Sequence, residues 1–382
     1  MKASLDAFPF KYEIRREKTK NINMQSATSH GVKVENWMRE FSGCYTAIIT
    51  PMKRNCEVDY EGLKSLIEFQ LKGDVSGILA VGTTGESPTL TWREHIKVIE
   101  KVHEFSGGKC LTIGGTGSNN TEESLKATRE VEDFGVKCVL LVEPYYNGPS
   151  SLEIRKEYVE PIAAEFPDIQ IIPYVIPGRT GTQLLPQDLA ILHSQFKNVR
   201  AVKEATGNLE NMKLTRRLCG EDFDILSGDD DKTYVMMKDS AVGASGVISV
   251  ASNIAPGRVQ EFVQTLLKGK TAECEKLSEV LKPLFSIVTV KTEEETPYGS
   301  ATCKARNPLA YKTLMNVLGM PSGPCRRPLG KMTKKGLETV LNAARTVYER
   351  TPEILEPIER FFDVDLSKRL HDEKSWRRLY YD

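Results

Sequence analysis

Short apolar runs rich in β-branched residues alternate with amphipathic stretches along the chain from Phe41 onward. The apolar runs lie at 44–49, 77–81, 110–114, 138–142, 169–174, 199–203, 223–227 and 246–250. Runs of this length that end in turn residues are typical of buried strands. The stretches between them predict helices at 59–72, 91–104, 121–134, 151–165, 186–195, 208–218 and 233–242, with one more after Pro256.

Eight strand–helix repeats predict parallel strands that are joined by helical crossovers. This count favours a closed (β/α)8 TIM barrel of the α/β class over an open sheet. An open dinucleotide-binding sheet would carry a GxGxxG turn after its first strand. The sequence has Thr50-Pro51-Met52-Lys53 at that place instead.

The segments outside the barrel differ from it in pattern. Residues 1–40 are rich in charge and lack strand patterns, so we expect an N-terminal extension, followed by the catalytic barrel at 41–268. From 269 to 350 the strand patterns give way to helical ones broken by prolines, which predicts a C-terminal helical subdomain. The mixed-charge end, 351–382, is expected to be a C-terminal extension that forms one more helix or docks on the body.

The N-terminal extension bears on localisation. It lacks the apolar run of a secretory signal, and its interspersed acidic residues are atypical of a transit peptide. We interpret it as a flexible or docking segment, with organelle targeting or a later start at Met24 as the alternatives. The eight cysteines form no CxxC pair, and no apolar run reaches the roughly 20 residues that cross a bilayer. We therefore expect a soluble cytoplasmic protein with reduced thiols, or a plastid protein if the source is eukaryotic.

Composition limits the classes of partner. The chain carries 52 basic and 52 acidic residues, so its formal net charge is zero. Nothing in this balance favours a nucleic acid or an anionic membrane as partner, whereas a charge near zero favours self-association. His95 and His103 are wrongly spaced for a zinc site on one helix, and no metal site is predicted.

In a (β/α)8 barrel the catalytic residues lie where the strands end. Lys203 ends the sixth predicted strand among apolar residues. Burial there would favour the neutral amine, which is a nucleophile toward carbonyl groups; the alternative is a strand-end lysine that reaches water. Tyr174 ends the neighbouring fifth strand, and Arg179 follows closely. We expect all three side chains to share one pocket.

Other predicted strand ends are also polar. The second ends in Gly82-Thr83-Thr84-Gly85-Glu86, whose hydroxyls and amides suit a carboxylate, although a tight turn with a helix cap is the alternative. The fourth ends in PYYN (144–147), where adjacent tyrosines serve packing more often than catalysis. A buried amine, a phenol, paired threonines and an arginine together suit Schiff-base chemistry on a keto acid.

Six motifs resemble those of a known enzyme family in type and order. They are GTTGES (82–87), PYYN (144–147), PGRTG (177–181), VKEATGN (202–208), LSGDD (226–230) and GVISVASN (246–253). With these, residues 41–350 resemble the dihydrodipicolinate synthase family of pyruvate-dependent class I aldolases, to whose superfamily N-acetylneuraminate lyase belongs. GTTGE is shared across that superfamily, and the GRTG after the fifth strand favours the synthases.

The resemblance implies a catalytic role for four residues. Lys203 would form an imine with pyruvate, so that no separate cofactor is needed. Thr83, Tyr174 and Tyr146 would relay protons, with Tyr146 reaching into the site of a neighbouring subunit. The imine would lose a methyl proton, and the resulting enamine would attack the aldehyde of L-aspartate 4-semialdehyde. Cyclisation would then release Lys203 and give 4-hydroxy-tetrahydrodipicolinate, the first committed intermediate toward diaminopimelate and lysine.

Four further residues would bind substrate by the same resemblance. Thr84 would hold the carboxylate of pyruvate, and Arg179 that of aspartate semialdehyde. Gly228 and Ile248 would line the pocket through their backbones. The family usually has Asn after the tyrosine of the fifth strand, whereas this chain has Pro173-Tyr174-Val175. Because proline removes a backbone donor, the fine positioning of the phenol is in question.

The resemblance also implies a regulatory site. Relatives that lysine inhibits bind it at a dimer interface, and the matching positions here are Ser87, Pro88, Trp92, His95, Asn119, Glu123 and Tyr145. Glu123 and Asn119 would meet the ammonium groups, and Trp92 would offer an aromatic wall. The alternative is that Trp92 and His95 only pack at the dimer interface.

Three functions follow in order of preference. The first is the synthase, expected as a homodimer or as a homotetramer built from two dimers. The second is another pyruvate-dependent aldolase of the superfamily, acting on a sugar acid or N-acetylneuraminate. The third is a non-catalytic ligand sensor, which would have no need of Lys203, Tyr174, Tyr146, Thr83 and Arg179 together.

Overall fold

The computed structural model describes residues 40–381. The predicted N-terminal extension, apart from its last residue, lies outside the described residues. Among residues 40–381, no helix is both long enough and apolar enough to span a lipid bilayer.

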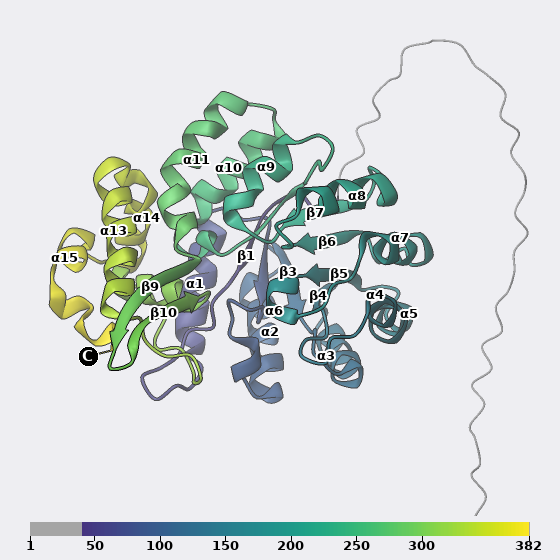
Figure 1. Cartoon of the computed structure of the whole chain (residues 1–382), viewed down its shortest axis with the longest axis horizontal. Helices are drawn as coiled ribbons and strands as arrows, with labels where there is room; N and C mark the ends of the chain where they lie inside the picture. Colours follow the sequence, from purple (N-terminus) through teal and green to yellow (C-terminus); the bar gives the residue numbers. More distant parts are fainter. Residues whose placement is uncertain (1–39, 382) are drawn as a thin grey trace, which may run out of the picture. The chain divides into compact units, whose positions relative to one another are not determined.

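Eight parallel strands close into a barrel, as predicted (Figure 1). Each strand pairs with the next in the sequence, and β8 pairs with β1. The strands are β1 (Gly43–Ala47), β2 (Gly77–Ala80), β3 (Leu111–Gly115), β4 (Cys138–Val142), β5 (Gln170–Val175), β6 (Ala201–Glu204), β7 (Asp224–Ser227) and β8 (Gly246–Ser249).

Helices connect the strands around the barrel and agree closely with the amphipathic stretches. They are α1 (Tyr60–Lys72), α2 (Trp92–Ser106), α3 (Thr121–Asp133), α4 (Ser151–Glu153), α5 (Glu160–Glu165), α6 (Pro177–Thr180), α7 (Pro186–Gln195), α8 (Leu209–Cys219), α9 (Thr233–Lys238) and α10 (Pro256–Leu267). A π-helical stretch, Ile154–Val159, joins α4 to α5. The prediction of a helix over 233–242 was too long, because the side chain of Asp239 accepts from the backbone N–H of Ala241 and forms a turn.

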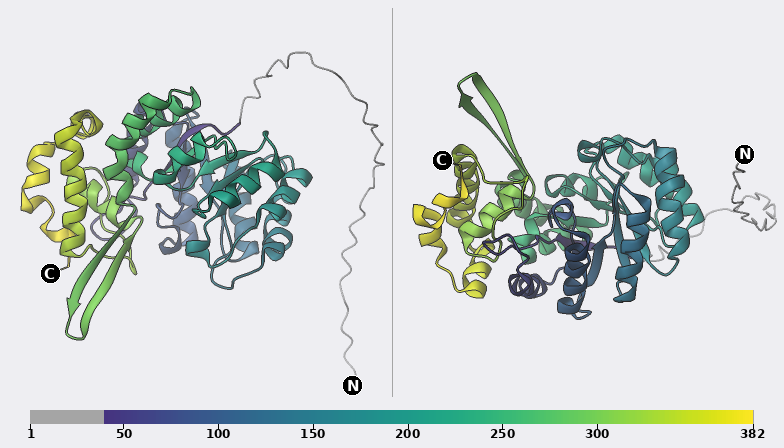
Figure 2. Two further views of the ribbon diagram at one scale, coloured as in Figure 1. Left: turned by 45° about the horizontal axis from the view of Figure 1, so that its top comes forward. Right: turned by 90° about the horizontal axis from the view of Figure 1, so that it is seen from below.

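The C-terminal part is built mainly of helices, as predicted, but it also contains a β-hairpin. Its helices are α11 (Thr271–Ser286), α12 (Leu309–Leu318), α13 (Lys334–Arg350), α14 (Glu356–Phe362) and α15 (Leu366–His371). The expectation that no strand follows the barrel was wrong. Two further strands, β9 (Thr289–Thr296) and β10 (Gly299–Arg306), form an antiparallel pair. This hairpin extends away from the helices (Figure 2).

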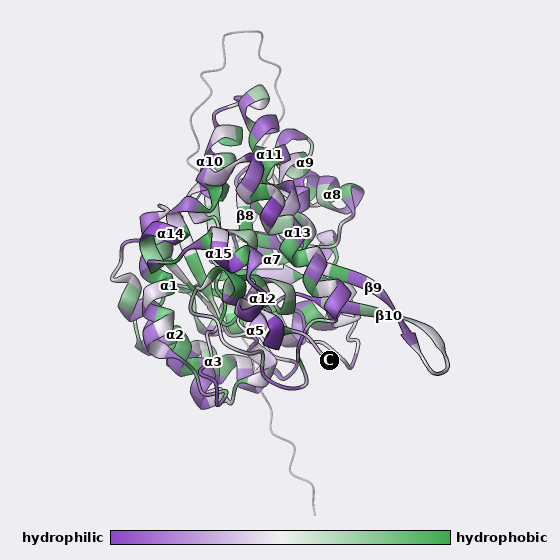
Figure 3. Cartoon of the chain, turned by 90° about the vertical axis from the view of Figure 1, so that its left-hand side faces the viewer, coloured by the Kyte–Doolittle hydropathy of each residue, from purple (hydrophilic) through white to green (hydrophobic). Residues whose placement is uncertain are grey.

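The hairpin escaped detection because it contains no apolar run. Its residues are mostly Thr, Ser, Lys and Glu, and hydrophilic positions mark both strands (Figure 3). One face nevertheless packs on the body: Val290 is buried, and the Thr292 and Thr333 hydroxyls lie 3.2 Å apart. Residues on the opposite face, such as Lys291 and Lys304, are exposed.

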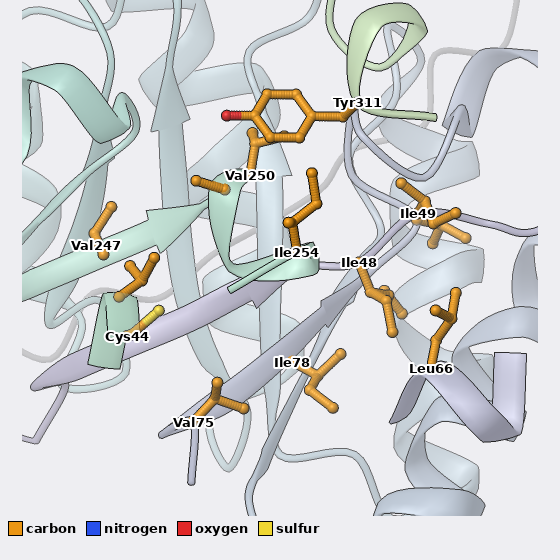
Figure 4. Close-up of a cluster of buried hydrophobic side chains, with 14 of the residues drawn as sticks. Cys44, Ile48, Ile49, Leu66, Val75, Ile78, Val247, Val250, Ile254 and Tyr311 are labelled. Atoms are coloured by element: carbon orange, nitrogen blue, oxygen red, sulfur yellow. The ribbon is translucent and has the colours of Figure 1, made fainter. Parts of the chain in front are cut away.

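The barrel and the C-terminal helices share a continuous apolar core. A second, smaller cluster fills the barrel interior and includes Leu79, Ile172 and Ile248. Tyr311 of α12 lies beside Val250, which follows β8, and its hydroxyl donates to the Leu284 carbonyl at 2.6 Å (Figure 4). The predicted boundary at 268 and 269 therefore falls between helices that belong to one core.

The last thirty or so residues, the expected C-terminal extension, form α14, α15 and short 3-10 turns that dock on the body. Arg369 donates to the carbonyls of Asn316 and Val317 at the end of α12. Phe361 packs its ring 5.4 Å from that of Phe69 on α1. These contacts bring the end of the chain onto helices of both the barrel and the C-terminal part.

Candidate active site

Lys203 and Tyr174 lie side by side at the carboxyl ends of adjacent strands. They are register partners on β6 and β5, and the Lys203 Nζ atom is 4.1 Å from the centre of the Tyr174 ring. Each side chain is only 5% exposed. The alternative of a lysine that reaches water is therefore wrong.

Burial changes the acid–base properties of both groups. Burial lowers the pKa of Lys203 and Arg179 adds a smaller effect in the same direction, whereas Asp229 and Asp230 oppose it; the resulting pKa is about 8. Burial also raises the pKa of the Tyr174 phenol above its ordinary value, because the interior disfavours the charged phenolate. Near neutral pH the site therefore holds an amine that loses its proton easily beside a phenol that keeps its proton.

A cavity of about 240 Å³ opens at this end of the barrel. Thr83, Tyr174 and Arg179 belong to its lining, and a hydrogen bond joins Thr83 to the Tyr174 phenol. Lys203 lies beside the ring that forms part of this wall. The structure thus brings together the predicted amine, phenol, hydroxyl and guanidinium.

Asn307, which follows the hairpin, connects two of the predicted carboxylate-binding residues. Its Nδ2 donates to the Thr84 hydroxyl at 2.9 Å, and its carbonyl accepts from Arg179 Nη2 at 3.2 Å. Both Thr84 and Asn307 are buried. Sequence analysis missed Asn307, because it lies more than a hundred residues beyond Arg179 and follows none of the barrel strands.

Glu143, at the end of β4, fixes the segment that carries Arg179. Its carboxylate accepts from the backbone N–H groups of Ile176 at 2.9 Å and Leu184 at 2.6 Å, and from the Thr180 hydroxyl at 3.1 Å. Burial raises the pKa of Glu143 to about 7, although these hydrogen bonds act against the shift. Its place directly after a strand was a signal that sequence analysis did not use.

The residues that follow β7 supply the backbone of Gly228 and the carboxyl groups of Asp229 and Asp230 to the site. A Cβ atom on Gly228 would lie 2.7 Å from that of Ala205, so only glycine fits there. Asp230 accepts from the Ser249 hydroxyl at 2.5 Å and from two backbone N–H groups that follow β8. Burial raises the pKa of Asp229 to about 6. Ile248 is fully buried in the barrel interior.

Tyr146 does not join the other predicted catalytic residues within this chain. It is 90% exposed, and its backbone has φ of 82°, which is rare for a residue other than glycine. Its N–H donates to the Thr180 carbonyl at 3.3 Å, which ties its backbone to the segment that carries Arg179. The catalytic role of its phenol therefore stays a prediction.

Comparison with known proteins places the chain in a family. A model of the Dihydrodipicolinate synthetase family matches residues 40–346. The chain belongs to this family. The 4-hydroxy-tetrahydrodipicolinate synthase of Methanococcus maripaludis is 40% identical over 301 residues, which are 79% of this chain and 96% of the relative.

Solved structures of the family agree with the fold. The 4-hydroxy-tetrahydrodipicolinate synthase from Methylacidiphilum fumariolicum SolV has a TM-score of 0.74 and 34% identity, covering 84% of this chain and 99% of that chain. The DHDPS from Cyanidioschyzon merolae with lysine bound has a TM-score of 0.73 and 33% identity, covering 81% and 99%. The suspected membership of the dihydrodipicolinate synthase family is confirmed.

The residues predicted to form a lysine site do not all line one hollow. Ser87, Pro88 and Tyr145 line the same cavity as Thr83 and Arg179. A separate surface hollow is lined in part by Trp92 and Glu123.

Several contacts hold Trp92, Glu123 and their neighbours in place. The Trp92 ring lies 4.8 Å from that of His95, whose Nε2 is 2.6 Å from the Gly115 carbonyl. Glu123 accepts from the Ser118 hydroxyl at 2.6 Å, and the neighbouring Asn119 is exposed. Burial lowers the pKa of His95, so its ring is neutral near pH 7.

The proline that precedes Tyr174 does not displace this tyrosine from its strand. Pro173 lies inside β5 opposite Leu141, and Tyr174 keeps its pairing with Lys203. Val175 is buried in the core between strands and helices.

Among residues 40–381, no group of three or more His, Cys, Asp and Glu side chains is arranged to hold a metal ion.

Proposed function

We propose that this protein condenses pyruvate with L-aspartate 4-semialdehyde to form 4-hydroxy-tetrahydrodipicolinate, as a lyase of diaminopimelate and lysine biosynthesis. Membership of the family supports this activity. The observation that carries the mechanism is the buried Lys203 amine beside the Tyr174 phenol, 4.1 Å from its ring centre. This pair is suited to forming and protonating an imine.

The first step uses Lys203 as the nucleophile. Its neutral amine attacks the keto carbon of pyruvate, water leaves, and an imine joins the substrate to the enzyme. The amine itself therefore supplies the covalent chemistry, and no separate cofactor is required. Thr84 is suited to the carboxylate of pyruvate, because its hydroxyl accepts from Asn307 and keeps its own proton to donate.

Proton transfer is the proposed role of Tyr174 and Thr83. As water leaves, the Tyr174 phenol gives up its proton, and the phenolate then takes the methyl proton of the protonated imine. The resulting enamine attacks the aldehyde carbon of the second substrate. The oxygen formed there needs a proton. Because burial raises the pKa of Tyr174, the phenol is protonated and able to donate, and its hydrogen bond to Thr83 links it to a second hydroxyl at the cavity wall.

Arg179 is proposed to bind the carboxylate of aspartate semialdehyde. Its guanidinium lines the cavity and contacts the Asn307 carbonyl. Among the described residues it forms no ion pair with a carboxylate, so its charge is available to a ligand. The amino group of the bound semialdehyde then attacks the imine carbon, which closes the ring and releases Lys203.

Tyr146 is proposed to act in the site of a neighbouring subunit. Its exposure supports this role, since its side chain is not part of the cavity lining described for its own chain. The protein would then work as a homodimer or as a homotetramer of two dimers. A strained backbone at an exposed tyrosine is consistent with a contact that only a second copy supplies.

Feedback inhibition by lysine is a further part of the proposal. It is supported by the relative whose structure contains lysine and by the hollow lined by Trp92 and Glu123. A carboxylate beside an aromatic ring suits an amino group. Initial rates that stay unchanged in millimolar lysine would reject this regulation.

The test of the main proposal is pyruvate consumption with a panel of aldehydes, for the wild type and for Lys203→Ala. Turnover with aspartate semialdehyde that is lost in the variant is the expected result. Turnover only with N-acetylmannosamine or a sugar-derived aldehyde would point to another aldolase of the superfamily. The absence of turnover with every aldehyde would favour the ligand sensor.

A further inference from the structure

A second arginine lies close to Arg179, which lines the cavity of the candidate active site. Arg306 is the last residue of β10, and its Nη1 donates to the carbonyl of Gly178 at 3.2 Å. Arg179 in turn donates to the carbonyl of Asn307, the residue after Arg306. The two guanidinium groups are thus held close together by reciprocal contacts with backbone.

Neither of these charges is neutralised by a direct partner. Among the ion pairs of residues 40–381, none includes Arg179 or Arg306, and both guanidinium groups instead donate to carbonyl groups. Asp229 is the acidic group whose charge acts on Arg179 from across the site. Two neighbouring arginines without a paired carboxylate are an arrangement that favours an anionic ligand.

The foot of the hairpin adds two lysines to this positive charge, and Glu293 and Glu295 follow on the same face toward its tip. Residues two apart on a strand share a face, so Lys304 lies on the same face as Arg306, and Lys291 is the direct cross-strand partner of Lys304. Like charges directly opposite each other are unfavourable for a hairpin. Their exposure at the foot of the hairpin therefore fits a role in binding better than a role in folding.

We propose that Arg306 joins Arg179 in binding the carboxylate of the second substrate, and that Lys304 and Lys291 attract this anion to the pocket mouth. The inference rests on the proposed function and adds a specificity residue to it. Thr84 is buried and bonded to Asn307, whereas Arg306 is exposed and directly precedes Asn307 in the chain. A ligand with one keto-acid end and one distal carboxylate would therefore contact both positions.

The first test measures turnover of the full-length protein with aspartate semialdehyde. Arg306→Gln is expected to raise the KM for the semialdehyde by about threefold to tenfold with kcat nearly unchanged, because charges at a rim act mainly on capture. The dependence of kcat/KM on salt should also weaken. Lys270→Gln, which removes the same charge from an exposed site between α10 and α11, is the matched control. An unchanged KM in Arg306→Gln would overturn the proposal.

A double-variant cycle separates direct binding from an effect through Arg179. Arg306→Gln in an Arg179→Gln background should still raise the KM for the semialdehyde. If the second substitution then has no effect, Arg306 only positions Arg179, and direct binding is rejected. Arg306→Lys should recover part of the loss, since it keeps the charge without the planar fork.

A titration tests the same pair without turnover. We would titrate the protein with 2-oxoglutarate, a keto acid with a distal carboxylate, and compare it with pyruvate by calorimetry. Arg306→Gln should weaken the binding of 2-oxoglutarate roughly threefold more than the binding of pyruvate, because only 2-oxoglutarate loses a charge-assisted contact. Equal effects on both ligands, or no binding of 2-oxoglutarate to the wild type, would overturn the proposal. If the wild type fails to turn over aspartate semialdehyde, the proposed function fails while this titration still decides the role of Arg306.

Discussion

Lys312 and Glu86 form a buried ion pair with 2.6 Å between Nζ and Oε1. Lys312 lies on α12, whereas Glu86 follows the two threonines proposed for the active site. Lys312 also donates to the carbonyls of Thr50 and Pro324, so each of its polar contacts is internal. The pair therefore ties the C-terminal part to the loop that carries Thr83 and Thr84.

Breaking this pair should destabilise the fold strongly. Lys312→Met leaves the Glu86 carboxylate buried beside a methionine and should lower the free energy of unfolding by about 3–5 kcal/mol. Urea unfolding of the variant would measure the loss. The double variant Lys312→Met with Glu86→Gln removes the isolated charge and should recover much of the stability. A single variant as stable as the wild type would show that the pair is not needed.

The reactivity of Lys203 should depend on pH in a defined direction. Because burial lowers its pKa to about 8, the ammonium form prevails below pH 8 and the neutral nucleophile prevails above it. The rate of trapping with borohydride in the presence of pyruvate should therefore rise with pH and reach half its maximum near pH 8. Lys203→Arg should give no trapped adduct. A midpoint near the ordinary lysine pKa of about 10.4 would contradict the inferred environment.

The barrel and its reactive pair could be predicted because their signals are local. Parallel strands that are buried on both faces produce continuous apolar runs, and this chain shows eight of them. The fold rule that active sites form at carboxyl ends then selects Lys203 and Tyr174, which the structure places as register partners. The roles of these residues remain predictions.

The contacts of the remaining parts of the site could not be predicted, because the tertiary fold creates them. Asn307 and Arg306 reach the pocket only through a hairpin whose polar strands lack an apolar pattern. Glu143 acts by accepting hydrogen bonds from backbone groups more than thirty residues away. The position of Glu143 directly after β4 marks it as a candidate, but its partners and the contacts of Asn307 and Arg306 have no signal in spacing or composition.

Gly228 should tolerate no side chain. In Gly228→Ala the new Cβ would lie 2.7 Å from Ala205 Cβ and 3.0 Å from the Glu204 carbonyl, both just after Lys203. Overpacking of this kind costs about 1–3 kcal/mol, and the displaced backbone should lower kcat/KM as well. Gly257→Ala is the control, because its Cβ would meet Gly73 only at ordinary distances. Equal stability and activity in the two variants would contradict the expectation.

Tyr146 should be required from a different subunit than Lys203. Its 90% exposure in the single chain predicts that Tyr146→Phe lowers kcat without a change in stability, since no packing is lost. Lys203→Ala and Tyr146→Phe should each be nearly inactive alone. The two variants are then mixed, dissociated and reassembled. Random pairing makes half of the dimers mixed, and each mixed dimer has one site with an intact Lys203 from one chain and an intact Tyr146 from the other. Activity should therefore return to about a quarter of the wild type. A mixture as inactive as its components would place Tyr146 in the site of its own chain.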